Sequence, residues 1–232
     1  MADFVPRLIG APTAAERMDA LCEFIEFWLG PRREEYGVPD HELDTYSLPM
    51  PLRRLYQFAG RWPGFHGQES NFAVCAFSRQ DSLRSLERLE ITDEGRIAFL
   101  DENQGNWECS TLVQGDDPPV WCNGDFFDDE GGPHEGDKQA CDSLSKFLVT
   151  FVLQEITFGS RVTLGDDALT EQFEAKNAKA IPVWEHGPYV SGSESCFYLW
   201  SGLLVANLWG DYCFGANRDE AIDFLMAHQG PV

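Results

Sequence analysis

Carboxylates are the most abundant ionisable groups in this sequence. Aspartate and glutamate number 39 among 232 residues, against 17 lysines and arginines, so the formal net charge is −22. Six acidic side chains lie among glycines within residues 123–137: Asp125, Asp128, Asp129, Glu130, Glu135 and Asp137. Because like charges this close in sequence repel one another, we expect an extended, solvated loop that a cationic partner would neutralise.

Calcium is one candidate ligand for these carboxylates. The common calcium-binding loop places acidic or amide residues at alternate positions ahead of a glycine. Here Phe126 and Phe127 occupy positions where ligands are required, so the sequence predicts no calcium site of that type, and only irregular, weak calcium binding is left. The two phenylalanines either anchor the segment to the core, which we favour, or form the apolar centre of a charged interface.

Cysteine and histidine could instead bind zinc. Structural zinc sites usually contain two ligands within two to four residues of each other. The set formed by Cys109, Cys122, His134 and Cys141 has no such pair. We therefore expect small, buried, reduced thiols that hold no metal, and no cofactor. This expectation covers all seven cysteines: Cys22, Cys75, Cys109, Cys122, Cys141, Cys196 and Cys213.

Catalytic signatures are absent from the sequence. There is no glycine-rich phosphate-binding motif, no G-x-S-x-G elbow and no H-E-x-x-H. The histidines are isolated from one another, and no nucleophile, base and orienting group can be named together. We therefore predict that the protein is not an enzyme, with an unrecognised hydrolase as an alternative.

The charge and the hydropathy pattern restrict partners and compartment. A strongly acidic surface repels nucleic acid and anionic membranes, and it attracts basic proteins. The longest uncharged stretch, residues 195–210, contains Ser201, Gly202 and Asn207, so it does not satisfy the roughly 18 apolar residues of a membrane span. Scattered cysteines and the lack of a secretory signal at the N-terminus predict a cytoplasmic protein.

Three helices are predicted in the first two thirds of the chain. Thr13 and Glu16 form a capping box ahead of a helix that ends at Gly30-Pro31. A second helix spans residues 50–59, and a third runs from Asp142 or Ser143 to Gly159. The third has one inward face that contains Leu144, Phe147, Leu148, Phe151 and Val152.

Strands are predicted between and after these helices. The first group covers residues 72–77, 96–101, 106–113 and 120–122, with a short helical turn at 81–89. A later meander comprises residues 181–186, 196–200, 203–208 and 212–215. Short helices over 168–176 and from Asn217 flank this meander, the last one burying Ala221, Ile222, Leu225 and Met226. The fold class is therefore α+β, with an antiparallel sheet of about six strands packed against helices.

Three stretches resemble the SMI1/KNR4 family of the SUKH superfamily. They are residues 48–64 (LPMPLRRLYQFAGRWPG), residues 99–109 (FLDENQGNWEC) and residues 115–121 (GDDPPVW). The resemblance is most specific over residues 48–159, which include the helix DSLSKFLVTFVL, and is looser beyond Arg161. It implies one domain over residues 1–232, with a core at about 13–159 and a β-rich extension at about 160–232. That extension either continues the sheet or adds a second layer.

The resemblance also implies a role. Many bacterial members resemble immunity proteins against secreted toxins, and the family's surface binds other proteins without catalysis. Combined with the acidity, this predicts a module that neutralises a basic toxin, such as a nuclease, by imitating nucleic acid. An intracellular adaptor or scaffold is the alternative. The candidate partner-binding residues are Asp125, Asp128, Asp129, Glu130, Asp116, Asp117, Glu102 and Trp107.

Overall fold

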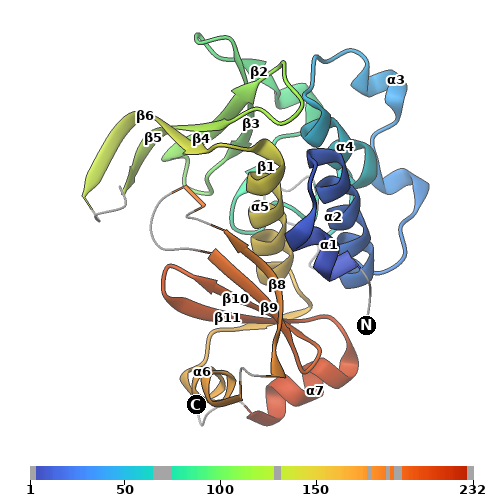
Figure 1. Ribbon diagram of the computed structural model, residues 1–232, viewed down its shortest axis with the longest axis vertical. Helices are drawn as coiled ribbons and strands as arrows, with labels where there is room; N and C mark the ends of the chain where they lie inside the picture. Colours follow the sequence, from blue (N-terminus) through green and yellow to red (C-terminus); the bar gives the residue numbers. More distant parts are fainter. Residues whose placement is uncertain are drawn as a thin grey trace.

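The structure is an α+β arrangement of two antiparallel sheets and seven α-helices in the residues that it describes (Figure 1). The computed structural model describes residues 4–64, 75–127, 132–176, 179–186, 189–190 and 195–228. The fold class predicted from the sequence is confirmed. None of the helices in these ranges is both long and apolar enough to span a membrane.

Two of the first four helices were predicted from the sequence, and two were not. Helix α1 (Phe4–Gly10) precedes α2 (Ala14–Leu29), where Thr13 Oγ1 accepts a hydrogen bond from the Glu16 N–H at 3.3 Å. The segment predicted as a polar connection contains the short helix α3 (Asp40–Leu43), and α4 (Met50–Ala59) follows as predicted. Leu52, Leu55, Tyr56 and Ala59 of α4 are buried, as expected.

The first sheet has six strands, as the sequence predicts. Its order is β1-β3-β4-β5-β6, with β2 also paired to β3. The strand predicted at 72–77 is absent from its described part, because residues 75–77 form a bend whose side chains are buried, and residues 72–74 lie outside the described ranges. The strands are β1 (Ser82–Leu83), β2 (Glu90–Ile91), β3 (Arg96–Asp101), β4 (Trp107–Leu112), β5 (Val120–Phe127) and β6 (Pro133–Cys141).

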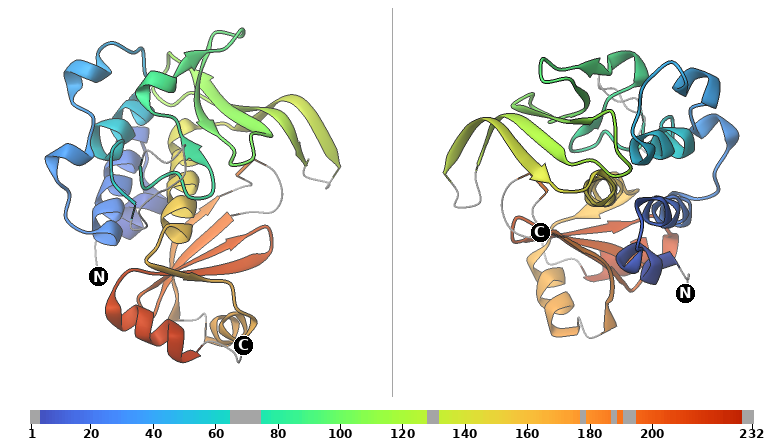
Figure 2. Two further views of the ribbon diagram at one scale, coloured as in Figure 1. Left: turned by 180° about the vertical axis from the view of Figure 1, so that it is seen from behind. Right: turned by 45° about the horizontal axis from the view of Figure 1, so that its top comes forward.

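Helix α5 (Leu144–Phe158) lies between the two sheets, beside α2 and α4 (Figure 2). Phe147 and Phe151 are buried as predicted. The other three residues predicted to point inward are buried as well, and the burial extends beyond that face to Ser145, Gln154 and Glu155. A helix enclosed on every side must satisfy these polar groups internally.

Five strands between residues 162 and 216 build a second sheet on the far side of α5. Its order is β7-β11-β10-β9-β8, and every pairing is antiparallel. Helices α6 (Asp167–Lys176) and α7 (Asp219–His228) cover its outer face. Both faces are therefore buried, which explains the apolar run at 203–206. The strands are β7 (Val162–Leu164), β8 (Ile181–His186), β9 (Ser195–Trp200), β10 (Leu203–Leu208) and β11 (Asp211–Ala216).

Most of the predicted meander and its helices are confirmed, with one exception. Ala221 and Leu225 of α7 are buried, and Ile222 is half-buried. Met226, which we expected in the core, is 53% exposed. Only one side of α7 packs against the sheet, so fewer of its apolar side chains are buried than the sequence pattern predicts.

Candidate functional site

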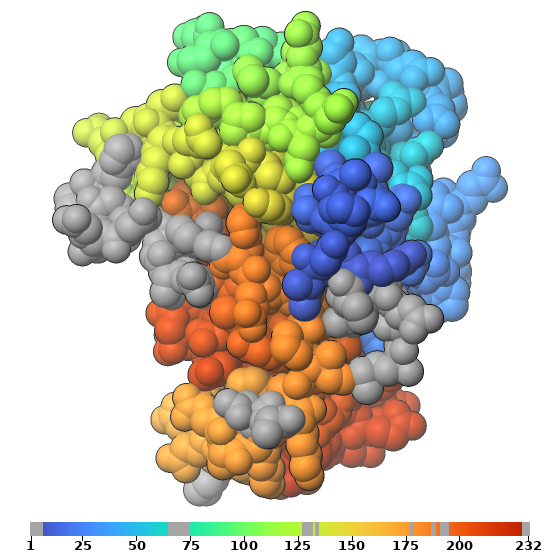
Figure 3. Space-filling model, in the orientation of Figure 1, coloured from blue at the N-terminus to red at the C-terminus, as the bar shows by residue number. Residues whose placement is uncertain are grey.

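The acidic segment forms a β-hairpin and not the loop that its composition predicts. Strands β5 and β6 pair from Val120 opposite Cys141 to Phe127 opposite Pro133. Phe126 is 8% exposed and belongs to the core, which confirms it as an anchor. In Figure 1 the hairpin extends beyond the body of the first sheet, and its residues form the upper left margin of the molecule in Figure 3.

An alternation of buried and exposed side chains along β5 explains why this segment forms a strand. Cys122 and Phe126 are buried, whereas Asn123 and Asp125 between them are exposed. This period of two is the signature of a strand with one solvated face. Cross-strand hydrogen bonds then stabilise a segment whose glycines and aspartates favour loops on their own.

Four side chains share the solvated side of this hairpin, and we call them the hairpin face: Asn123, Asp125, Glu135 and Asp137. Asn123 stands opposite Asp137 and Asp125 stands opposite Glu135. All four residues are exposed. Directly opposed residues have Cβ atoms about 4.5–5.5 Å apart, so a pair of like charges there destabilises the sheet.

One of the three carboxylates is neutralised by an arginine. The Arg96 guanidinium donates to both Asp137 oxygens, at 2.7 and 2.9 Å, and its Cζ lies 4.2 Å from the centroid of the Trp121 ring. The bidentate bond with Asp137 outweighs partial burial and raises the pKa of Arg96. Within the described part of the chain no ion pair forms at Asp125 or Glu135.

A second arginine forms ion pairs with three carboxylates nearer the centre of the sheet. The Arg84 side chain is 7% exposed and lies 2.6 Å from both Asp101 and Glu108, and 3.0 Å from Glu90. Burial opposes the charge on Arg84, but these carboxylates more than compensate and raise its pKa. Among the carboxylates described above on the first sheet, Asp125 and Glu135 are the two without an arginine partner.

The two predicted site residues between β4 and β5, Asp116 and Asp117, differ in their surroundings. Asp116 is exposed. Asp117, in contrast, accepts hydrogen bonds from the Ser145 N–H at 2.7 Å and the Ser143 hydroxyl at 2.6 Å, and Arg17 lies 3.6 Å away. Asp117 thus stabilises the N-terminus of α5 and is poorly placed to meet a partner.

Glu102 and Trp107 also contribute to the framework. The Glu102 carboxylate accepts the N–H groups of Gln104 at 2.9 Å and Asn106 at 3.0 Å, so it closes its own turn. Trp107 is half-buried against the core, with its ring centroid 6.1 Å from that of Tyr189. Asp128, Asp129 and Glu130 lie outside the described residues.

Two buried carboxyl groups lie behind the Glu102 turn, where a surface hollow of about 510 Å³ opens between residues 78–82 and 101–105. Burial raises the pKa of Asp81 to about 7 and that of Glu155, on α5, to about 8. The negative charge of Asp81 adds to the rise at Glu155, and that of Glu102 adds to the rise at Asp81. Glu155 accepts three backbone N–H groups of residues 79–81, and Gln154 donates to Asp81 at 3.1 Å. This pair holds the 79–81 loop in place.

The sequence did not reveal the pairing of Asp125 with Glu135. The strand predicted over residues 120–122 ends before Asp125. The two residues face each other only because β5 continues to Phe127. The polar alternation along residues 122–126 was the signal that could have found it.

Comparison of the chain with family models, with curated proteins and with solved structures finds no match in any of the three. The geometry of the site is therefore the basis for the function proposed below.

Proposed function

We propose that the protein is a non-catalytic binding module that captures a basic protein on the hairpin face. The observation that supports this most directly is the opposed pair of Asp125 and Glu135. Two exposed like charges across a strand pair cost stability. A cationic side chain of a partner, placed between them, would convert that repulsion into two charge-assisted contacts.

The charge of the whole molecule adds to this local effect. A net charge of −22 attracts a basic protein over a distance and speeds its association. A nuclease cleft is cationic because it must hold phosphate, so an acidic projecting hairpin could fill it. The resemblance to SMI1/KNR4 proteins supports the same role, that of an immunity protein that neutralises a basic toxin in the cytoplasm.

A capture experiment tests the proposal with a charge-matched control. The whole chain would be immobilised as wild type, as the double variant Asp125→Asn/Glu135→Gln, and as the control Glu171→Gln/Glu174→Gln. The control removes the same number of charges from exposed positions on α6. Proteins bound from a lysate of the native organism would be identified by mass spectrometry.

We expect a basic protein on the wild type and the control that is lost from the hairpin variant and released by salt. A partner without excess positive charge would support an adaptor role instead. Equal capture by the hairpin variant and the wild type would contradict the hairpin face as the binding surface.

A further inference from the structure

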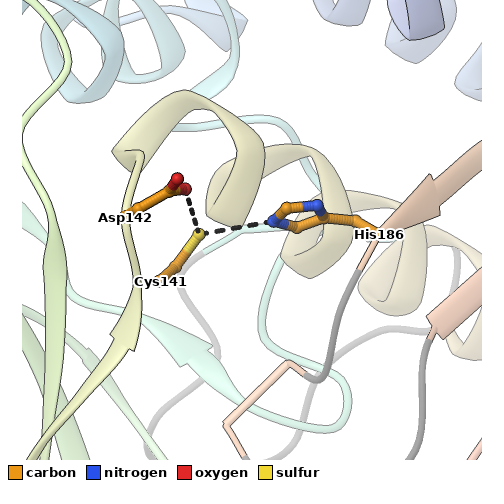
Figure 4. A group of neighbouring side chains, drawn as sticks. All are labelled: Cys141, Asp142 and His186. Carbon is orange, nitrogen blue, oxygen red and sulfur yellow. Dashed lines mark hydrogen bonds between the residues drawn. The ribbon is translucent and has the colours of Figure 1, made fainter.

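Three side chains with metal-binding atoms meet where the two sheets approach the start of α5 (Figure 4). Cys141 ends β6, Asp142 follows it, and His186 ends β8 of the second sheet. The Cys141 sulfur lies 3.5 Å from His186 Nε2 and 3.9 Å from Asp142 Oδ1. All three ligand atoms lie within 4.8 Å of one another.

These separations suit a tetrahedral zinc ion. Zinc–sulfur and zinc–nitrogen bonds of about 2.3 and 2.0–2.1 Å at a tetrahedral angle place the two ligand atoms about 3.6 Å apart. The separation of 3.5 Å between Cys141 and His186 matches this value without movement. Asp142, whose side chain is 71% exposed, needs only a small rotation to bring its oxygen as close.

We propose that Cys141, Asp142 and His186 bind a zinc-type divalent cation and leave one coordination position for water or a further ligand. One sulfur, one nitrogen and one oxygen form a donor set typical of zinc, whereas calcium and magnesium take oxygen ligands. This proposal departs from the expectation that the cysteines bind no metal. Two of the three ligands, Cys141 and Asp142, are adjacent in the sequence. Because only pairs of cysteine and histidine were considered in the sequence, this pair was not identified.

Neighbouring residues orient two of the ligands, and one lysine competes with the cation for the third. Cys141 is 9% exposed, and its thiol donates to the Ser143 carbonyl at 3.2 Å. The ring of Trp184 lies 5.7 Å from that of His186 and restricts its orientation. Lys146 Nζ, 3.5 Å from Asp142 Oδ1, is the cation that the metal must displace from this carboxylate.

Burial raises the pKa of the Cys141 thiol, so the metal must release its proton on binding. Because Cys141 belongs to β6 and His186 to β8, the bound cation would link the two sheets. It would therefore stabilise the folded chain by mass action.

Cobalt serves as the spectroscopic probe for this site. The whole chain, treated with EDTA and dialysed, would be titrated with Co²⁺ and then with Zn²⁺, with the thiolate-to-cobalt absorption band in the near ultraviolet as the readout. We expect a band that saturates at one equivalent, that Zn²⁺ abolishes, and that accompanies a rise in the Tm.

Two ligand variants and one control make the test specific. Cys141→Ser should lose the band, and His186→Gln should weaken Co²⁺ binding by at least about tenfold, a loss seen even for outer-shell partners. Cys213→Ser, at a half-buried cysteine of β11, should retain it. Circular dichroism would show that each variant is folded. A folded wild type without the band, or a band that survives in Cys141→Ser, would overturn the proposal.

Discussion

Phe151 shows at the scale of one residue how α5 is held between the sheets. Its side chain is fully buried, and its ring lies 6.4 Å from that of Tyr189 in a stacked arrangement. Phe151→Ala should lower the free energy of unfolding by about 3–5 kcal/mol, because it removes buried surface and leaves a cavity. Lys146→Ala on the same helix should stay within about 0.5 kcal/mol. Urea denaturation measures both losses, and equal losses would contradict the burial of Phe151 and the partial exposure of Lys146.

The buried carboxyl pair should make stability depend on pH. The folded pKa values of Asp81 and Glu155 are raised to about 7 and about 8, above unfolded values of about 4. The folded state therefore keeps protons that the unfolded state releases. This contribution to stability is complete below about pH 4 and is lost as the pH rises towards 8.

Asp81→Asn tests this dependence. The variant removes one of the two titrating groups and its repulsion of Glu155, while an amide oxygen can still accept from Gln154. The fall in unfolding free energy between about pH 5 and pH 8.5 should therefore be smaller than in the wild type. Asp125→Asn, at an exposed position, should leave the fall unchanged. An Asp81 variant as pH-dependent as the wild type would show that the pair is not responsible.

Individual elements differ in how far their sequence determines them. The Thr13 cap of α2, the four strands of the meander and α5 depend on local signals, and all were predictable. Glu16 departs from the predicted capping box, since its carboxylate accepts from the Thr13 hydroxyl. The β5–β6 hairpin was not, because its glycines and aspartates have loop propensities that only cross-strand pairing overrides. The meeting of Cys141 with His186 was equally hidden, since it depends on how two sheets pack around one helix.

Gly124 offers a test of the hairpin as an element. Its φ is +133°, and a Cβ there would lie 2.2 Å from the Asn106 carbonyl oxygen and 2.7 Å from the Trp107 Cα. Gly136 opposite has φ +101° but open space around it. Gly136→Ala should cost about 1–2 kcal/mol from backbone strain alone. Gly124→Ala should lower the free energy of unfolding further, because the new methyl group would clash with the backbone of β4 and its preceding residue. Equal losses for the two variants in thermal unfolding would contradict this close contact between β5 and β4.

At the scale of the whole molecule, one core joins both sheets. Phe99 of β3, Val152 of α5 and Leu204 of β10 belong to the same buried cluster. A second, smaller cluster fills the space between the second sheet and helices α6 and α7. The C-terminal strands are therefore packed on α5. The β5–β6 hairpin projects from this common body (Figure 1).

The net charge of the molecule leads to the last prediction, which concerns association with the captured partner. Asp125, Asp128, Asp129 and Glu130 would be changed together to Asn or Gln. Association should become slower and less dependent on salt, because charges at the edge of an interface attract a partner through the total electrostatic potential of the surface. Folding stability should stay unchanged or rise slightly as repulsion is relieved. Stopped-flow measurements at several salt concentrations would show the effect.

The competing surface is the loop that contains Asp116. Asp116→Asn is the suitable probe there, since Asp117 stabilises α5 and its replacement would disturb folding. If binding survives the hairpin changes but is lost in Asp116→Asn, the site lies on that loop. Binding that ignores salt and both sets of variants would refute the electrostatic mechanism, because the steering of a basic partner by a charge of −22 must weaken as salt screens it.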